Sequence, residues 1–308
     1  MKENSSAINK KFFDLDTLWD ARRPAVAEAE YVALLGEATH LPEGERHHLA
    51  ELLTLIARAQ GAQGKLPEAR LNLAEAEKIL ATLEPPFQAK VNIRCLMEEG
   101  RLFVAEKTPS RARVLLSQAW SLAVNSEDDY ATIDIARLMA EIEPPKLQEE
   151  WISKAIQIAE ESTQPRAQRW LGNLYASLAW KQFGLLQYET ALATFQKSLG
   201  LYEAEKAEHE IFKTKWSVGK LLRKMGRLEE ALALQKGLLS ELGFSGGADG
   251  RLYEEIAECL QALQKTAEAQ PYFELAHKEL SSEQWVSDNQ PVKLKRLKDL
   301  GKVRGSSS

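Results

Sequence analysis

The sequence predicts an all-α protein built from antiparallel helix pairs that repeat along the chain. Three observations predict this class. Leu and Ala dominate the apolar 44% of the 308 residues, with many Glu, Lys and Gln between them, and these residues favour helices. A pattern of small residues returns at regular intervals. Prolines fall between the expected helices, where they do not interrupt one.

The repeat is defined by two small residues per unit. Segments 64–76 (GKLPEARLNLAEA) and 226–232 (GRLEEAL) share a small residue near the start of the second helix, and a bulkier residue follows four positions later. The first small residue recurs at spacings of 36 to 43 residues, at Ala69, Ala112, Ala191, Ala231 and Ala269, with a weaker copy at Gln148. Another small residue lies twelve positions earlier, at Ala57, Gly100, Ala136, Ala179, Gly219 and Ala257. Small residues at these positions let paired helices approach closely.

Helix-breaking residues and the two terminal segments are consistent with this repeat of helix pairs. Pro85-Pro86, Pro144-Pro145 and Pro165 separate expected helices. Segment 243–250 (GFSGGADG) is an expected loop, and it lacks the lysine of a phosphate-binding loop. Residues 15–36 and 290–302 are expected to form capping helices, which repeat arrays need at their ends. We expect residues 306–308 to be disordered.

These segments resemble the tetratricopeptide repeat family over about residues 50 to 280. The resemblance implies a right-handed superhelical solenoid of antiparallel helix pairs, with about six repeats and capping helices at both ends. The expected repeats are 50–83, 93–126, 129–162, 172–205, 212–245 and 250–283. Residues 1–49 are then an N-terminal tail with capping helices, and residues 284–308 a C-terminal capping helix with a disordered tail. The third repeat is degenerate, so its register stays open.

The resemblance also implies a concave groove lined by the first helix of each pair. Although the chain has a net charge of −5, the positions carried over to this groove are basic and aromatic. Arginine pairs with carboxylates through two parallel hydrogen bonds, and exposed Trp and Arg anchor many interfaces. We therefore expect the groove to bind an acidic peptide or protein segment. The residues are Arg94, Arg101, Arg137, Asn173, Trp180, Phe183, Lys213, Trp216, Lys220 and Arg223.

Another interpretation of the same residues is a solvated helix face, in which arginines pair with glutamates on neighbouring helices and the tryptophans belong to the core. The cluster Lys213, Trp216, Lys220 and Arg223 is the strongest candidate, since its spacing places all four on one helix face. The sequence leaves open whether the groove is free or occupied by the chain's own terminal segments.

The expected function is a non-catalytic scaffold or adaptor, because no catalytic motif is found and an open groove disfavours chemistry. One alternative is a sensor that changes conformation when a peptide binds. Another is a metal-dependent hydrolase using His40, His47 and His48 with Glu43 and Glu45. Those residues lack regular ligand spacing on a helix, so we expect no metal and no cofactor.

The remaining features bear on partners and location. The acidic balance disfavours nucleic acid. No apolar run suits a signal sequence or a membrane-spanning helix, so we expect a cytoplasmic protein without membrane insertion. Cys95 and Cys259 lie far apart and indicate neither a disulfide framework nor a zinc site. The identity of the partner and homo-oligomerisation stay open.

Overall fold

The computed structural model describes residues 15–85, 87–244 and 248–302. The expected N-terminal tail, the centre of the 243–250 loop and the expected disorder at 306–308 lie outside these residues. Every regular element in this part of the chain is a helix, which confirms the all-α prediction. The contacts divide the chain into two compact units, Met1–Trp170 and Leu171–Ser308, and the sequence analysis placed no boundary between them.

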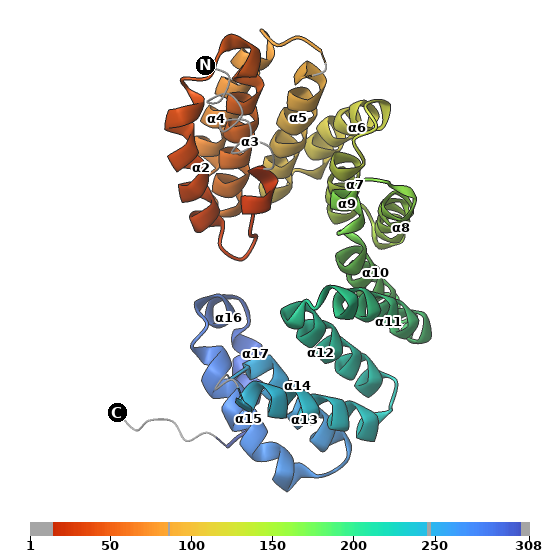
Figure 1. Cartoon of the computed structure of the whole chain (residues 1–308). Helices are drawn as coiled ribbons and strands as arrows, with labels where there is room; N and C mark the ends of the chain where they lie inside the picture. The colour runs from red at the N-terminus through yellow and green to blue at the C-terminus, as the bar shows by residue number, and fades with distance from the viewer. Residues whose placement is uncertain (1–14, 86, 245–247, 303–308) are drawn as a thin grey trace, which may run out of the picture. The chain divides into compact units, whose positions relative to one another are not determined.

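The first unit consists of three helix pairs, with further helical elements before the first pair and after the last (Figure 1). The N-terminal elements are η1 (Leu15–Leu18), α2 (Pro24–Ala38) and η2 (Glu43–Glu45). The pairs are α3 (Arg46–Ala62) with α4 (Leu66–Leu80), α5 (Phe87–Ala105) with α6 (Pro109–Asn125), and α7 (Asp129–Ile142) with α8 (Pro145–Glu161). The short α9 (Pro165–Gln168) follows. The first helices contact one another, α3 with α5 and α5 with α7.

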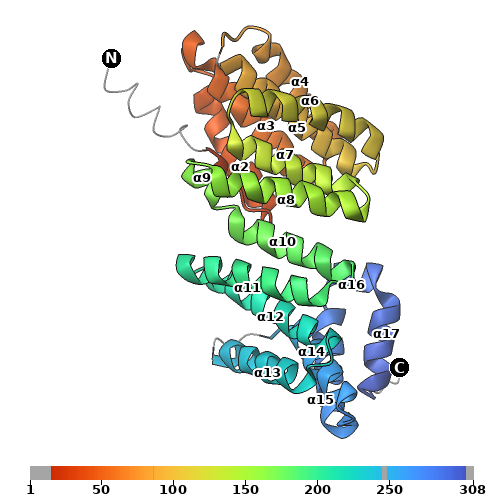
Figure 2. The same cartoon turned by 90° about the vertical axis from the view of Figure 1, so that its right-hand side faces the viewer.

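The second unit repeats this arrangement. Its pairs are α10 (Leu171–Gly184) with α11 (Tyr188–Glu205), α12 (Glu208–Lys224) with α13 (Leu228–Phe244), and α14 (Gly250–Ala262) with α15 (Thr266–Ser281). The capping elements α16 (Gln284–Asn289) and α17 (Pro291–Leu300) close its C-terminal end, and both pack against α15 (Figure 2). The expected number of pairs and the caps at both ends are therefore confirmed.

Small residues occupy the helix crossings, as the repeat pattern predicts. In the first unit Ala57, Ala69, Ala112 and Ala136 have no exposed surface. At Gly100 an added Cβ would approach Leu116 of the paired helix to 2.9 Å. In the second unit Ala179, Ala191, Ala231, Ala257 and Ala269 are equally buried. The residues that define the repeat thus define the places where two helices of a pair approach most closely.

The turns of the array use two kinds of local signal, glycines between paired helices and aspartates between successive pairs. Gly64, after α3, and Gly226, after α12, have φ values of +77° and +79°, a conformation that glycine adopts without strain. Helix starts are capped by aspartates in two places. Asp128 accepts a hydrogen bond from the Ala131 amide at 3.0 Å, and Asp249 accepts one from the Leu252 amide, also at 3.0 Å.

Two further sequence expectations concern membrane-spanning helices and the cysteines. Among the described helices, none carries an apolar stretch of the length that a bilayer crossing requires. Cys95 and Cys259 are free and buried in different units. Burial raises the pKa of each thiol to about 12, so both thiols are protonated at neutral pH.

Candidate functional site

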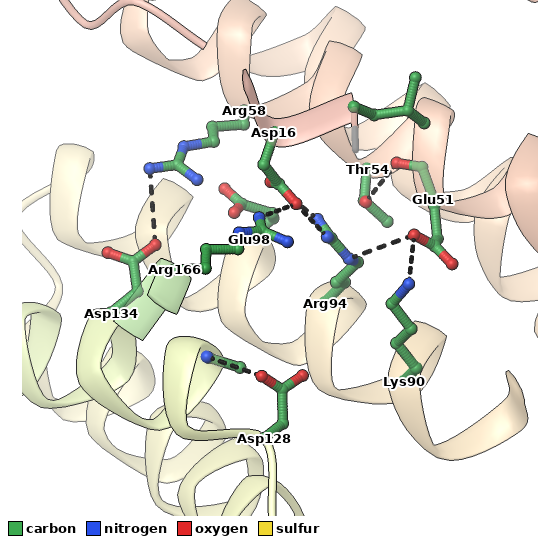
Figure 3. A network of polar contacts seen from close by, with 12 residues as sticks. Asp16, Glu51, Thr54, Arg58, Lys90, Arg94, Glu98, Asp128, Asp134 and Arg166 are labelled. Carbon is green, nitrogen blue, oxygen red and sulfur yellow. Dashed lines mark hydrogen bonds and ion pairs between the residues drawn. The ribbon is translucent and has the colours of Figure 1, made fainter. Parts of the chain in front are cut away.

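The first helices of the first unit hold a cluster of charged side chains between them, much of which Figure 3 shows. This charged cluster includes three predicted groove residues, Arg94, Arg101 and Arg137, and acidic partners for each of them. Side chains from η1, α3, α5, α7 and α9 contribute to it. Its members are Asp16, Glu51, Arg58, Lys90, Arg94, Glu98, Arg101, Asp134, Arg137 and Arg166.

One carboxylate, that of Asp134 on α7, lies between three guanidinium groups. Its oxygens are 2.9 Å from Arg101 Nη2, 2.9 Å from Arg137 Nη1 and 3.5 Å from Arg58 Nη2. The side chain is completely buried. Burial alone would raise the pKa of Asp134, but the attraction of the guanidinium groups, Arg101 foremost, more than offsets it, and the pKa lies well below its usual range. Asp134 therefore joins α3, α5 and α7 electrostatically.

A second carboxylate, that of Asp16 in η1, contacts Arg94 of α5 and Arg166 of α9 (Figure 3). Arg94 donates from both terminal nitrogens to the two carboxylate oxygens. Burial alone would raise the pKa of Asp16, yet the two arginines hold it well below its usual range. Arg94 Nε is also 3.9 Å from Glu51, which pairs mainly with Lys90 at 2.9 Å.

The second unit brings together an aromatic pair, Trp180 of α10 and Trp216 of α12. Their ring centroids are 6.3 Å apart and the rings are tilted by 42°. Both side chains are half-buried. The Lys220 ammonium lies 5.1 Å from the Trp216 ring and 5.9 Å from the Trp180 ring, within the range of cation–π attraction. The indole nitrogen of Trp216 donates to the Arg251 carbonyl at 3.4 Å.

Two cavities open beside these rings. The larger has a volume of about 370 Å³, and its wall includes Trp180, Lys213, Trp216, Asp249 and Arg251. The smaller, of about 240 Å³, shares Trp180 and Lys213 with it. Lys213 is exposed, and no carboxylate of the described residues lies within ion-pair distance of its ammonium group. The two cavities therefore meet at an apolar wall with one cation that has no ion-pair partner in the described chain.

The aspartate and the arginine of the larger cavity, and two cations of α12 nearby, already have partners. Arg251 forms two hydrogen bonds with Glu283, at 2.8 and 2.7 Å, and Asp249 caps α14. Arg223 and Lys220 both contact Glu255 of α14, whose carboxylate is 3% exposed.

Glu210 lines the smaller cavity only. In the larger cavity Lys213 is thus the charged group that remains available to a ligand.

The ten predicted groove residues divide into three groups. Asn173, Trp180, Lys213 and Trp216 line a cavity of the second unit. Phe183 packs against Trp180 and Tyr188 and lines neither cavity. The other members pair with carboxylates of the chain itself, and these are Arg94, Arg101, Arg137, Lys220 and Arg223. Pairing with other elements was the alternative interpretation in the sequence analysis, and the structure shows it for Arg94, Arg101, Lys220 and Arg223. Arg137 pairs instead with Asp134 of its own helix.

Several acidic partners escaped the sequence analysis, among them Asp134, Glu255 and Asp16. Asp134 is the one acidic residue in the run ATIDIARLMA, whereas Glu255 directly follows Glu254 in YEEIAECL and does not stand out. An isolated acid at a buried helix position needs a cation, so the signal for Asp134 was present in the sequence. Asp16 had no comparable signal, because η1 reaches α5 and α9 only through the tertiary fold.

The histidine-rich segment comes together differently from the sequence expectation. His47, His48 and Glu51 of α3 have possible metal-ligand atoms that all lie within 4.8 Å of one another. His40 instead contacts the Gly36 carbonyl at 2.7 Å. His47 stacks on Phe87 with ring centroids 3.7 Å apart, and Glu51 is paired with Lys90. Lys90 contacts Oε2 of Glu51, and Oε1 is buried without a hydrogen-bond partner. A cation at this place would therefore meet the positive charge of the Lys90 ammonium group.

Comparison with known proteins supports the fold. No protein-family model matches the chain, and no curated protein matches it at a significant level. Among solved structures, the apo form of RapI has a TM-score of 0.72 at 15% identity, covering 98% of this chain and 82% of its own. The quorum sensor NprR from B. thuringiensis, in its apo form, has a TM-score of 0.65 at 17% identity, with 96% and 80% covered.

Two further structures share the fold. NprR in complex with its cognate peptide NprX has a TM-score of 0.60 at 15% identity, covering 99% of this chain and 86% of its own. Aspartyl phosphate phosphatase F from Bacillus subtilis has a TM-score of 0.53 at 13% identity, with 85% and 75% covered. The chain therefore has the tetratricopeptide-type helical fold of these proteins. At such identities the likeness extends to the fold alone.

Proposed function

We propose that this protein is a non-catalytic peptide-binding module whose second unit receives a peptide at Trp180, Trp216 and Lys213. The observation that carries the proposal is the junction of the two cavities at Trp180 and Lys213, with Trp216 on the wall of the larger one. An apolar side chain of the ligand would lie against the indole rings, and an adjacent carboxylate would contact the Lys213 ammonium group. The complex of NprR with its cognate peptide supports the proposal, because NprR is a protein of the same fold that binds a peptide.

The structure sharpens the ligand chemistry expected from the sequence. Because Lys220 and Arg223 share the Glu255 carboxylate as an ion-pair partner, a ligand need not carry a long acidic run. One carboxylate beside one large apolar side chain matches the larger cavity.

A cytoplasmic location belongs to the same proposal, and the free thiols of Cys95 and Cys259 support a reducing compartment. The proposal includes no cofactor, and the partner is a peptide or protein segment rather than nucleic acid.

A library of labelled hexapeptides, each made in an Asp and an Asn form, tests this proposal by fluorescence polarisation. We expect some Asp peptides to bind at least about tenfold tighter than their Asn forms, a difference of about 1.4 kcal/mol. Lys213→Glu and Trp216→Ala should each abolish the preference or the binding. Lys224→Glu, on the same helix but outside both cavities, is the matched control. Equal binding of Asp and Asn peptides would contradict the proposal.

A peptide-responsive sensor is the second candidate function, and the likeness to the quorum sensor NprR favours it. A sensor must have two conformations that bind the peptide with different affinity. Small-angle scattering with and without a peptide from the library separates the candidates. A change in the radius of gyration that Lys213→Glu abolishes supports a sensor, and an unchanged curve with saturated binding supports a simple adaptor.

A further inference from the structure

The N-terminal segment of the described chain lies on the charged cluster of the first unit in the manner of a bound peptide. Its anchor is Asp16, whose side chain is 4% exposed and contacts both Arg94 and Arg166. Three residues later, the Trp19 ring lies 4.6 Å from the Arg58 guanidinium group. Leu15 is buried, and its carbonyl accepts a hydrogen bond from the Tyr31 hydroxyl at 3.2 Å. The segment thus presents a carboxylate and an aromatic ring to a cationic surface.

The carboxylates in the surface beneath this segment already have cationic partners. Asp134 is already shared by Arg58, Arg101 and Arg137, and Glu51 is engaged by Lys90. Asp16 is the carboxylate that Arg94 and Arg166 have in common. If Asp16 moved away, the buried Arg94 and the partly exposed Arg166 would lose the anion that they share, which is costly for Arg94 unless another anion replaces it.

The segment is attached in a way that would allow such a replacement. η1 is a single short turn of 3₁₀ helix, Leu15–Leu18, and α2 begins only at Pro24. The connecting residues Ala21, Arg22 and Arg23 are exposed. Beside Asp16 lies a cavity of about 200 Å³, lined by Thr17, Tyr130, Arg166, Arg169 and Trp170 as well. There is therefore room next to the anchor, with cationic and aromatic walls.

We propose that Arg94, Arg166 and Arg58 form a carboxylate-binding peptide site in the first unit, and that the chain's own Asp16–Trp19 segment is its resident occupant. Its ligand in trans is a peptide with an acidic residue followed three positions later by an aromatic residue, which must displace the resident segment. This site uses residues of the first unit only, so it is independent of the function proposed for the second unit.

A synthetic peptide of residues 15–22 (LDTLWDAR), labelled with fluorescein, is the probe. The full-length chain with Asp16→Asn and Trp19→Ala should bind it at least tenfold tighter than the unchanged chain does, because the resident segment no longer competes. The same peptide with Asn at the position of Asp16 should bind at least tenfold more weakly. Asp20→Asn is the matched control, since Asp20 bonds only to Arg22 and Arg23 in the described chain, and it should behave as the unchanged chain.

A second arrangement leaves the site's residues intact, in case the double variant does not fold. A protease site inserted after Ala21 of the otherwise unchanged chain is cut after folding, and circular dichroism checks that the helices persist. Cleavage should make the probe bind, and an excess of unlabelled probe should compete. If cleavage leaves the probe unbound, or if both probes bind equally, the proposal is wrong. Lys213→Glu must leave probe binding unchanged, which keeps this result separate from that for the second unit.

Discussion

Arg223 donates two hydrogen bonds to Glu255, one from Nε at 2.8 Å and one from Nη2 at 3.2 Å. The pair connects α12 to α14, and Lys220 lies 3.6 Å from the same carboxylate. The Glu255 side chain is almost fully buried, and both cations have it as their ion-pair partner. A carboxylate in this position stabilises the packing of neighbouring helix pairs and is already engaged within the chain.

Removing Glu255 should therefore destabilise the protein. Glu255→Ala leaves Arg223 without its buried partner, and the free energy of unfolding should fall by about 3 kcal/mol. Urea denaturation followed by circular dichroism measures this change. Glu229→Ala, at an exposed position of α13, should stay within about 0.5 kcal/mol of the unchanged protein. A small effect at Glu255 would mean that the ion pair does little for stability.

The crossing of α12 and α13 gives a prediction about helix packing. At Gly219 an added Cβ would lie 2.3 Å from Nε2 of Gln235, and that nitrogen donates to the Trp216 carbonyl at 3.0 Å. Gly219→Ala should therefore lower the unfolding free energy by about 1 kcal/mol or more, despite the better helix propensity of Ala. Thermal denaturation measures the effect.

A glycine on the partner helix supplies the matched control. An added Cβ at Gly237 of α13 meets no atom within 4 Å, so Gly237→Ala should raise the unfolding free energy by about 0.5 to 1 kcal/mol. Combining Gly219→Ala with Gln235→Ala should recover part of the loss, since the clashing side chain is gone. If both glycine variants stabilise the protein, the close crossing at Gly219 is not a constraint.

Acid should weaken the first unit through its buried aspartates. The pKa of Asp134 is lowered in the folded state, so its contribution is complete above the unfolded pKa of about 3.9 and is lost as the pH falls further. Between about pH 5 and pH 3 the unfolded chain takes up a proton that the folded chain resists, which costs about 1 kcal/mol for each such group. Denaturation at both pH values should show this slope.

Two variants test whether Asp134 contributes to this loss of stability between pH 5 and pH 3. Asp134→Asn should be less stable at both pH values but should lose less between them than the unchanged protein. Asp299→Asn, at an exposed position of α17, should keep the original slope. An identical slope in Asp134→Asn would show that the ion pairs around Asp134 do not govern acid sensitivity.

The histidine cluster of α3 provides a test for metal binding. We expect the purified protein to carry substoichiometric zinc. The Lys90 ammonium group lies 2.9 Å from the Glu51 carboxylate, and its positive charge would repel a divalent ion at this place. Lys90→Gln should bind zinc more tightly, measured by isothermal titration, and Glu51→Gln should remove that gain. Stoichiometric zinc in the unchanged protein would instead revive the metal-dependent alternative.

The sequence by itself determined the helix pairs. Small residues at Ala57, Gly100 and Ala179 recur with the period of the repeat, and a crossing between neighbouring helices is a local event that such a pattern records. Capping aspartates and prolines between helices are local signals too. For these features the residues that matter lie within some forty positions of each other, so periodicity is enough.

Only the tertiary structure decided which charges are available to a ligand. In the sequence Arg94, Arg223 and Lys213 look alike, since each is a cation on the expected exposed face of a first helix. Their carboxylate partners lie on other elements, Asp16 in η1 and Glu255 in α14, and no helical period relates them. Charge pairing acts through space, so a single sequence does not reveal that Arg94 and Arg223 have carboxylate partners in the folded chain while Lys213 has no ion-pair partner among the described residues.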